Sequence, residues 1–210
     1  MTDIIADQHS YGVDIKHREI YLHGHHGSFE EDPGVEYRMA STFIKNIRSL
    51  DLVNKEPIVI HMHSVGGNWG DGMAIYDAIS LCQSYVIVVA YGQAESMSGI
   101  IMQAADARIM MPNAYFMAHY GSTESSGDYL TTQNEARYDK VIADKMFDIY
   151  ADQCVLGKFF KNHYKILTVE KVNRFLRRRM KLGDWYLTSD EAVLYGFADS
   201  VLDKSIDSLK

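Results

Sequence analysis

Apolar and polar positions along this chain follow patterns that predict a sheet flanked by helices. From Val35 to Leu50 the apolar positions recur every three or four residues, which is typical of a helix with one buried face. Runs rich in β-branched residues at 58–63 and 86–90 predict two strands, and a glycine turn at 64–68 leads into a helix between them. This order of strand, turn, helix and strand predicts a βαβ crossover, with parallel strands covered by helices. The apolar face of the intervening helix carries Ile75, Ala78, Ile79 and Cys82.

Shorter patterns predict the remaining elements. We expect strands at 19–23, 107–111 and 115–119, and helices starting at Ser96, around 169–180 and at 191–195. The last helix begins after the capping signature Thr188-Ser189-Asp190-Glu191, and Gly196 ends it. Residues 1–16 have no regular period, so we interpret them as a mobile arm or as a strand that needs a partner.

A long helix is predicted from about Thr132 to Val155. At 1.5 Å per residue it would reach roughly 35 Å, about the width of a small domain, so we expect it to project. Its apolar side would then need a partner, such as another copy of the chain. The small polar residues 121–128 before it predict an exposed segment.

Length, charge and cysteine content limit the class of protein. The chain has 210 residues, 47% of them apolar, which predicts a single domain over 1–210. The net charge is −7, and the cluster at 177–181 is too short to suggest nucleic acid, so we interpret it as a solvated helix end. Cys82 and Cys154 lie in apolar helical patterns and are interpreted as buried free thiols in a reducing compartment. No segment resembles a secretory signal or a membrane span, so we expect a cytoplasmic protein that binds no membrane.

Histidines gather at two places and raise the question of a metal site. His23, His25 and His26 stand within four positions, and His61 and His63 share one face of a predicted strand. No cysteine stands near the first group, and its spacing matches no closed tetrahedral zinc site. We interpret both groups as ordinary polar residues and predict no metal.

The stretch from Gly92 to His119 contains candidate groups for acyl transfer. Ser96 would stand on a sharp turn between a strand and a helix, beside unpaired backbone N–H groups. Acyl transfer needs a nucleophile, a base, a group that orients the base, and N–H donors for the oxyanion. Ser96 and His119 are candidates for the first two, and the Met97 and Gly67 amides for the donors. A serine at a helix start can equally be a structural cap, and a lone histidine after a strand is usually a satisfied polar residue.

Four segments together carry a family resemblance. They are Gly92–Met97, Met111–Asn113 with Met117–His119, Ser64–Gly67 followed by Ile75-Tyr76-Asp77, and Asp184–Gly196. The first resembles the Gly-Gln-Ala-Ala-Ser-Met segment of the ClpP family, the proteolytic subunits of Clp proteases. Met111–Asn113 and Met117–His119 are similar to the family's Leu-Pro-Asn and Met-Ile-His. Ser64–Gly67 is similar to its Ser-Pro-Gly-Gly turn, with Ile75-Tyr76-Asp77 in the helix after it. Asp184–Gly196 is similar to its Asp-Arg-Phe-Leu-Ser-Ala-x-Glu-Ala-x-x-Tyr-Gly. The chain is thus identified as a divergent or phage-type member, with matches in the family's order from about residue 19 to 201.

The resemblance implies a fold, a site and an assembly. The fold would be α/β, a ClpP/crotonase-like stack of ββα units with a strand-helix handle at about 120–155. The site would use Ser96 as nucleophile, His119 as base and then acid, and Asp184 as orienter, with the Gly67 and Met97 amides as oxyanion hole. The protein would be a serine endopeptidase acting through an acyl-enzyme, without metal or cofactor. Its partners would be further copies in heptameric rings stacked as a tetradecamer, an AAA+ unfoldase, and a peptide or unfolded protein as substrate.

Several positions depart from the family pattern. Val65 replaces a proline, Glu95 places a charge beside the nucleophile, Ser98-Gly99 replaces Gly-Ala, and Tyr120-Gly121 replaces a proline step. Segment 156–168 has no counterpart that we can place, and the amino-terminal arm is expected to lack the family's first helix.

Two alternative functions stay open. A catalytically silent ClpP-like ring subunit is one, although the intact set Ser96, His119 and Asp184 argues against it. An acyl-CoA enzyme of the crotonase superfamily is the other, and it would leave the pairing of Ser96 with His119 unexplained.

Overall fold

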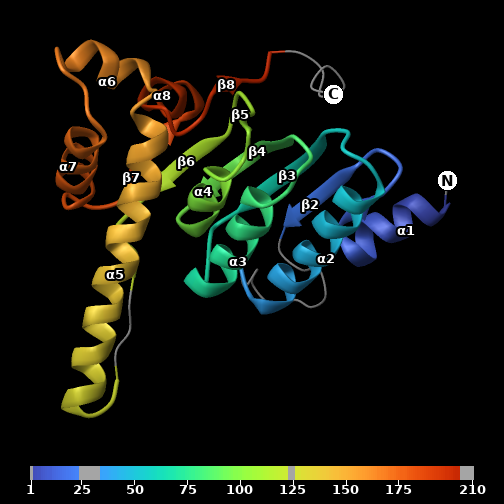
Figure 1. Ribbon diagram of the computed structural model, residues 1–210, viewed down its shortest axis with the longest axis horizontal. Helices are drawn as coiled ribbons and strands as arrows, with labels where there is room; N and C mark the ends of the chain where they lie inside the picture. Colours follow the sequence, from blue (N-terminus) through green and yellow to red (C-terminus); the bar gives the residue numbers. More distant parts are fainter. Residues whose placement is uncertain (1, 24–33, 123–125, 204–210) are drawn as a thin grey trace.

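A central sheet organises the chain in the computed structural model, which describes residues 2–23, 34–122 and 126–203 (Figure 1). The strands are β1 (Val13–Asp14), β2 (Glu19–His23), β3 (Ile58–Ser64), β4 (Val86–Glu95), β5 (Ala107–Met110), β6 (Tyr115–Ala118), β7 (Trp185–Thr188) and β8 (Ser200–Val201). The helices are α1 (Thr2–Tyr11), α2 (Tyr37–Val53), α3 (Trp69–Ser80), α4 (Met97–Met102), α5 (Tyr129–Cys154), α6 (Lys158–His163), α7 (Val169–Met180) and α8 (Ser189–Tyr195).

The sheet is mostly parallel, as the βαβ pattern predicts. Its main order is β1-β2-β3-β4-β5-β8, and only β1 runs antiparallel to its neighbour along this path. A branch leaves it at β4, because the second half of this strand pairs in parallel with β6, and β6 pairs antiparallel with β7. The branch accounts for the length of β4, which extends five residues beyond the predicted strand at 86–90.

Both faces of the central strands are apolar, which is expected for parallel strands. On one face, Ile58, Ile60 and Met62 of β3 pack into the main core, and α2, α3 and α4 lie over this face (Figure 1). On the other face, Val59 joins Ile87, Val89 and Ile109 in a second, smaller buried cluster. Alternation along β3 therefore divides its apolar residues between two cores.

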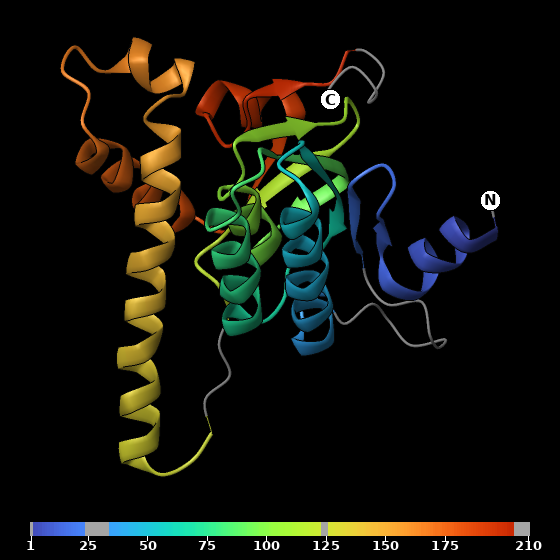
Figure 2. The ribbon, with the colours of Figure 1, turned by 45° about the vertical axis from the view of Figure 1, so that its right-hand side comes forward.

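Helix α5 projects from the sheet, as its predicted length suggested (Figure 2). Its 26 residues give a length of about 39 Å. It begins three residues before the predicted start because the Asp128 side chain accepts hydrogen bonds from the N–H groups of Leu130 and Thr131. Its C-terminal half packs into the core, whereas the N-terminal half exposes Tyr129, Leu130, Tyr138 and Val141.

The amino-terminal arm differs from its prediction. We expected no helix there, but α1 occupies residues 2–11, and Gly12 ends it with a φ of +63°. Much of the described surface of α1 is exposed, so its sequence carries no apolar period that would reveal it. The expectation of a strand with a partner is confirmed by β1, which pairs with β2. His25 and His26 lie outside the described residues.

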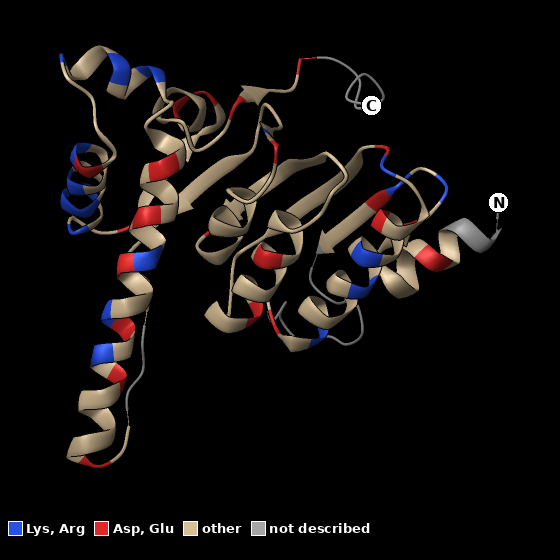
Figure 3. Ribbon diagram, viewed as in Figure 1, with Lys and Arg blue, Asp and Glu red and all other residues tan. Residues whose placement is uncertain are grey.

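The α6–α7 region was only partly predicted. Helix α7 matches the predicted range 169–180, but α6 lies within segment 156–168, for which we predicted no element. Lys and Arg gather on these two helices (Figure 3).

The interpretation of the cluster at 177–181 as a solvated helix end holds for Arg178 and Lys181, which are exposed. Arg177 pairs with Asp144 at 2.8 Å and lies 4.5 Å from the centre of the Phe147 ring, so it joins α7 to α5. Arg179 lies over Trp185, at the start of β7. Two of the three arginines therefore pack the helix onto its neighbours.

Both cysteines are free thiols, but they differ in burial. Cys154 is buried as predicted, whereas Cys82 lies just beyond α3 and is only half-buried. None of the helices in the described part of the chain combines the length and apolar composition needed to cross a lipid bilayer.

A buried polar network ties α2 to the loop before β4. The Asp51 carboxylate accepts hydrogen bonds from the Ser84 N–H and hydroxyl at 2.9 and 3.0 Å, and pairs with the Lys55 ammonium at 3.0 Å. Burial by itself raises the pKa of Asp51, but the bonds from Lys55 and Ser84 outweigh it and hold this pKa well below its usual range. Arg18 donates to the Ser84 hydroxyl at 3.0 Å and to the Leu50 carbonyl at 2.8 Å, so the turn before β2 joins the same network.

We expect Asp51→Asn to lower the free energy of unfolding at pH 7 by about 1–3 kcal/mol, because buried donors would lose a charged acceptor. A lowered folded-state pKa stabilises the protein above the unfolded value near 3.8, and this contribution is lost as pH falls through the folded pKa. The difference between variant and wild type should therefore shrink below about pH 4. Urea denaturation at pH 7 and at pH 3 measures both effects, with the exposed Asp77→Asn as control. Equal stability of Asp51→Asn and wild type at pH 7 would contradict the prediction.

Candidate active site

Three strands bring the predicted site residues to one place. Ser96 follows the end of β4, His119 follows β6, and Asp184 precedes β7. Ladder pairing sets Glu95 opposite Met117 and Ala118 opposite Trp185. Each site residue therefore stands next to the end of its strand, and the ladder β4–β6–β7 holds the three side by side.

Two contacts connect the side chains of these residues. Ser96 Oγ lies 2.7 Å from His119 Nε2, a hydrogen bond, and His119 Nδ1 lies 3.6 Å from Asp184 Oδ1. The second distance is that of an ion pair and is too long for a hydrogen bond. The side chain of His119 is 21% exposed and that of Asp184 is 54% exposed. The site is thus tight between serine and histidine and open at the carboxylate.

Ser96 has the backbone of a strained turn. Its φ of 51° and ψ of −120° lie where side chains other than glycine are disfavoured, at a cost of about 1–3 kcal/mol. The side chain makes no capping hydrogen bond to α4, so the alternative interpretation of Ser96 as a structural cap is excluded. The Ser96 N–H donates to the Met117 carbonyl at 2.9 Å, which fixes the turn against β6.

The glycine turn after β3 lies against the start of α4. A Cβ atom on Gly66 would come within 2.8 Å of both Met97 N and Ser96 Cβ, so only glycine permits this approach. The Val35 N–H donates to the Gly66 carbonyl, and the Asn68 N–H donates to the Val35 carbonyl. These two bonds lie on either side of Gly67 and do not use the Gly67 N–H group. Met97 is the first residue of α4, and its N–H has no partner within the helix. The two predicted oxyanion donors therefore lie on adjoining segments.

A buried hydroxyl pair supports the same turn. Ser98 Oγ donates to Ser64 Oγ at 2.7 Å, and Ser64 Oγ accepts from the Gly66 N–H at 3.3 Å. The sequence marks Ser98 only as a departure from the family pattern, and we did not predict this contact. The available signal was a small polar residue in an otherwise apolar helix, since α4 is buried throughout.

Glu95 is the second residue that the sequence marked without explaining. The Tyr115 hydroxyl donates to Glu95 Oε1 at 2.7 Å and lies 2.9 Å from Gln93 Oε1. The hydrogen bond to Glu95, followed by burial, raises the pKa of Tyr115 to about 12. The phenol therefore stays protonated and keeps donating to the carboxylate at neutral pH.

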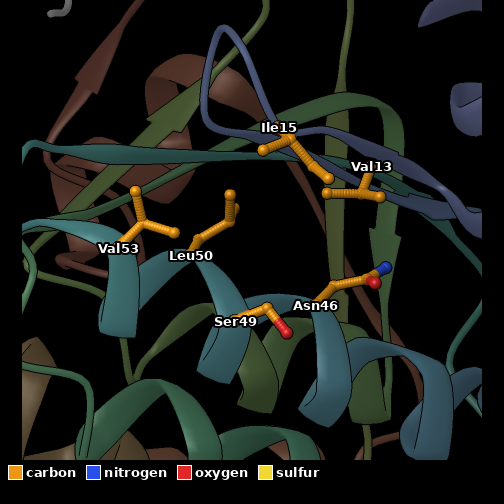
Figure 4. A pocket seen from close by; sticks show the side chains of 6 residues that line it. All are labelled: Val13, Ile15, Asn46, Ser49, Leu50 and Val53. Carbon is orange, nitrogen blue, oxygen red and sulfur yellow. The ribbon is translucent and has the colours of Figure 1, made fainter. Parts of the chain in front are cut away.

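The remaining candidate features lie elsewhere. His61 Nδ1 is 2.9 Å from the Tyr91 hydroxyl, and His63 Nδ1 is 3.1 Å from the Tyr91 carbonyl. Across the three described ranges, no group of three or more His, Cys, Asp or Glu residues could hold a metal ion. An apolar groove between β1, the loop after it and α2 contains none of the predicted site residues (Figure 4); it is lined by Val13, Ile15, Asn46, Ser49, Leu50 and Val53.

Comparison with known proteins points to one family. The family model described as Clp protease matches residues 31–205. The ATP-dependent Clp protease proteolytic subunit of Deinococcus radiodurans is 28% identical over 174 residues, which cover 81% of this chain and 78% of that protein. The subunit of the same name from Carsonella ruddii is 26% identical over 196 residues, covering 92% of this chain and 88% of that protein.

A solved structure supports the fold. A ClpP1 mutant from Listeria monocytogenes aligns with a TM-score of 0.72, over 93% of this chain and 96% of that chain, at 22% identity. The prediction of an α/β fold of ClpP type is confirmed.

Strain at Ser96 leads to a prediction about stability. Glycine adopts positive φ without steric cost, whereas alanine retains the Cβ atom. We expect Ser96→Gly to be more stable to unfolding than Ser96→Ala by about 1 kcal/mol, although both lose the hydroxyl. Thermal and urea denaturation of the two variants measure the difference. Gly99→Ala serves as the opposite control, because its Cβ would lie 2.7 Å from the Phe116 ring and should destabilise the protein. An alanine variant as stable as the glycine variant would show that the turn carries no strain.

Proposed function

This chain belongs to the Clp protease family, and on that premise we propose that it is a serine endopeptidase that cleaves peptide bonds through an acyl-enzyme on Ser96. The observation that carries the proposal is the 2.7 Å hydrogen bond between Ser96 Oγ and His119 Nε2 at a strained turn between strand and helix. A serine hydroxyl is a weak nucleophile until a neighbouring base can take its proton, and this contact supplies such a base.

The contacts of the site support the following reaction. His119 Nε2 takes the hydroxyl proton as Ser96 Oγ attacks the scissile carbonyl carbon, and it returns that proton to the leaving amine. The Gly67 and Met97 N–H groups donate to the oxyanion of the tetrahedral intermediate. Water then attacks the acyl-enzyme with His119 again as base, which releases the carboxylic acid and restores Ser96.

Asp184 has the role of orienting the imidazole. A carboxylate on the Nδ1–H side fixes the tautomer that leaves Nε2 free to accept a proton, and it stabilises the imidazolium. The 3.6 Å contact needs a shortening of less than about 1 Å to become a hydrogen bond, and the exposed Asp184 side chain has room to move. Catalytic hydrogen bonds are often long before substrate binds.

The family and the shape of the chain support an assembly of copies. We propose a single domain whose handle, α5 with the preceding segment, packs between heptameric rings stacked as a tetradecamer. The exposed apolar side chains at the projecting end of α5 support this, because exposed apolar surface on a soluble protein often marks a contact with another chain. Such a chamber in the cytoplasm would receive unfolded polypeptide from an AAA+ unfoldase.

The hydrogen bond between Ser96 and His119 also helps to choose between the peptidase and the two alternative functions. A silent ring subunit has no use for a strained serine bonded to a histidine, and an acyl-CoA enzyme of the crotonase type does not need this pair. The contact between Ser96 and His119 therefore favours the peptidase.

We expect Ser96→Ala to abolish labelling by a fluorophosphonate and to lower peptide turnover at least about 10³-fold, because the nucleophile is lost. Asp184→Asn should keep the fold and lower kcat by about 10²-fold or more, because the imidazole loses its orienting charge. Labelling followed by mass spectrometry, together with peptide kinetics, measures both, with Ser10→Ala on α1 as control. Labelling of another serine, or full turnover in Ser96→Ala, would exclude Ser96 as the nucleophile.

Helix α5 gives a separate test of assembly. We expect Val141→Asp to lower the mass of the assembly in light scattering, because it places a charge on an apolar surface that would be buried between rings. Ala136→Asp adds the same charge on a different side of the helix and should have a smaller effect. A mass unchanged by Val141→Asp would count against α5 as a contact between rings.

A further inference from the structure

Glu95 places a carboxylate on the face of the ladder that carries the candidate active site. Alternate residues of a strand share a face, so Tyr115 and Met117 lie on the same side of β6 as the position of His119. The register sets Gln93 opposite Tyr115 and Glu95 opposite Met117. The bond from Tyr115 to Glu95 Oε1 shows that the Glu95 side chain stands on this face, whereas Ala94 and Phe116 are fully buried on the other.

A hydrogen bond holds the carboxylate of Glu95 in place, but no positively charged side chain among the described residues pairs with it. Its hydrogen-bond donor, the Tyr115 hydroxyl, is neutral. Among the described residues, no Lys, Arg or His forms an ion pair with Glu95. The nearby ion pair joins His119 to Asp184 and does not include Glu95. Glu95 is half-buried, so water screens its charge less than that of a fully exposed side chain.

A fixed negative charge one residue before the nucleophile acts on whatever lies in the site. A substrate cation near the scissile bond would gain an ion pair with Glu95, and a substrate carboxylate would meet a like charge. Because Tyr115 already holds the carboxylate in one position, little side-chain freedom would be lost when the pair forms.

We propose that Glu95 is a specificity-determining residue, which favours polypeptides with a Lys or Arg side chain within two residues of the scissile bond. The inference rests on the proposed peptidase function. It assigns a substrate preference to this chain through a residue that replaces the alanine found at this point of the family's Gly-Gln-Ala-Ala-Ser-Met segment.

The test uses quenched fluorescent peptides in which one position carries Lys, norleucine or Glu. This position moves from two residues before to two residues after the scissile bond, and mass spectrometry identifies the bond that is cut. For the wild-type protein we expect kcat/KM to favour Lys over norleucine by about five-fold or more in at least one position. Glu95→Gln should bring this ratio to about one, and Glu95→Lys should make the Glu peptide the better substrate.

Matched variants separate charge, position and folding. Glu95→Ala introduces the residue of the family segment and repeats the test if Glu95→Gln does not fold. Tyr115→Phe keeps the carboxylate but removes its donor, so the preference for Lys should weaken without being lost. Asp77→Asn removes a negative charge on α3 and should leave the Lys to norleucine ratio unchanged.

The possible outcomes separate the proposed preference for Lys or Arg from the proposed peptidase function. Fluorophosphonate labelling of Ser96 together with equal Lys to norleucine ratios in wild type and Glu95→Gln would overturn the inference and leave the peptidase standing. Absence of labelling at Ser96 in the wild-type protein would overturn both. A ratio that falls in Glu95→Gln and reverses in Glu95→Lys would establish the preference.

Discussion

The site depends on one strand, β4, pairing with different neighbours along its length. Its first half pairs with β5 and its second half with β6. Gly92 lies between the halves with a φ of +50°, and a Cβ atom there would come within 2.6 Å of the His63 ring. On its other edge, β4 keeps β3 as its neighbour as far as the pair Ser64 and Ala94, so the change from β5 to β6 places Ser96 beside the end of β6. A strand that kept β5 as its neighbour would have no ladder leading to His119.

Local patterns predicted much of the fold and part of the site. Strand β2, helix α7 and the capping box of Thr188 and Glu191 agree with the sequence because their signals lie within a few residues. The turn at Ser96 was predictable for the same reason. The missed elements are α1, whose exposed surface has no apolar period, the short helix α6, the strand β7 and the two-residue strand β8. Asp184 came only from the family resemblance, because β6 and β7 lie far apart in the sequence and no local pattern reports their pairing.

Close packing around glycine explains why two backbone segments meet beside Ser96. The turn at Gly66 approaches Met97 N, and the hydroxyls of Ser64 and Ser98 join the same two segments from inside the core. On α3, a Cβ atom on Gly72 would lie 2.2 Å from Met97 Cγ, so the Met97 side chain occupies the space that this glycine leaves. The packing of the Met97 side chain against Gly72 and the buried hydrogen bond between Ser98 and Ser64 thus hold the Met97 amide in place. Preorganised donors of this kind are what stabilisation of an oxyanion requires.

The side chains of the site are held less firmly from Ser96 through His119 to Asp184, and the distances between them increase in the same order. Ser96 is fixed by its bond to the Met117 carbonyl and by the buried helix that begins after it. His119 is held by Ser96 on one side, and its ring is mostly buried. Asp184 follows Gly183, where a Cβ atom would meet no heavy atom within 4 Å, and more than half of its side chain is exposed. The short contact therefore occurs where the packing is close, and the long contact occurs where the side chain is exposed. In the proposed role of Asp184, the conformation of the 182–184 turn, rather than that of the serine turn, would determine how well the imidazole is oriented.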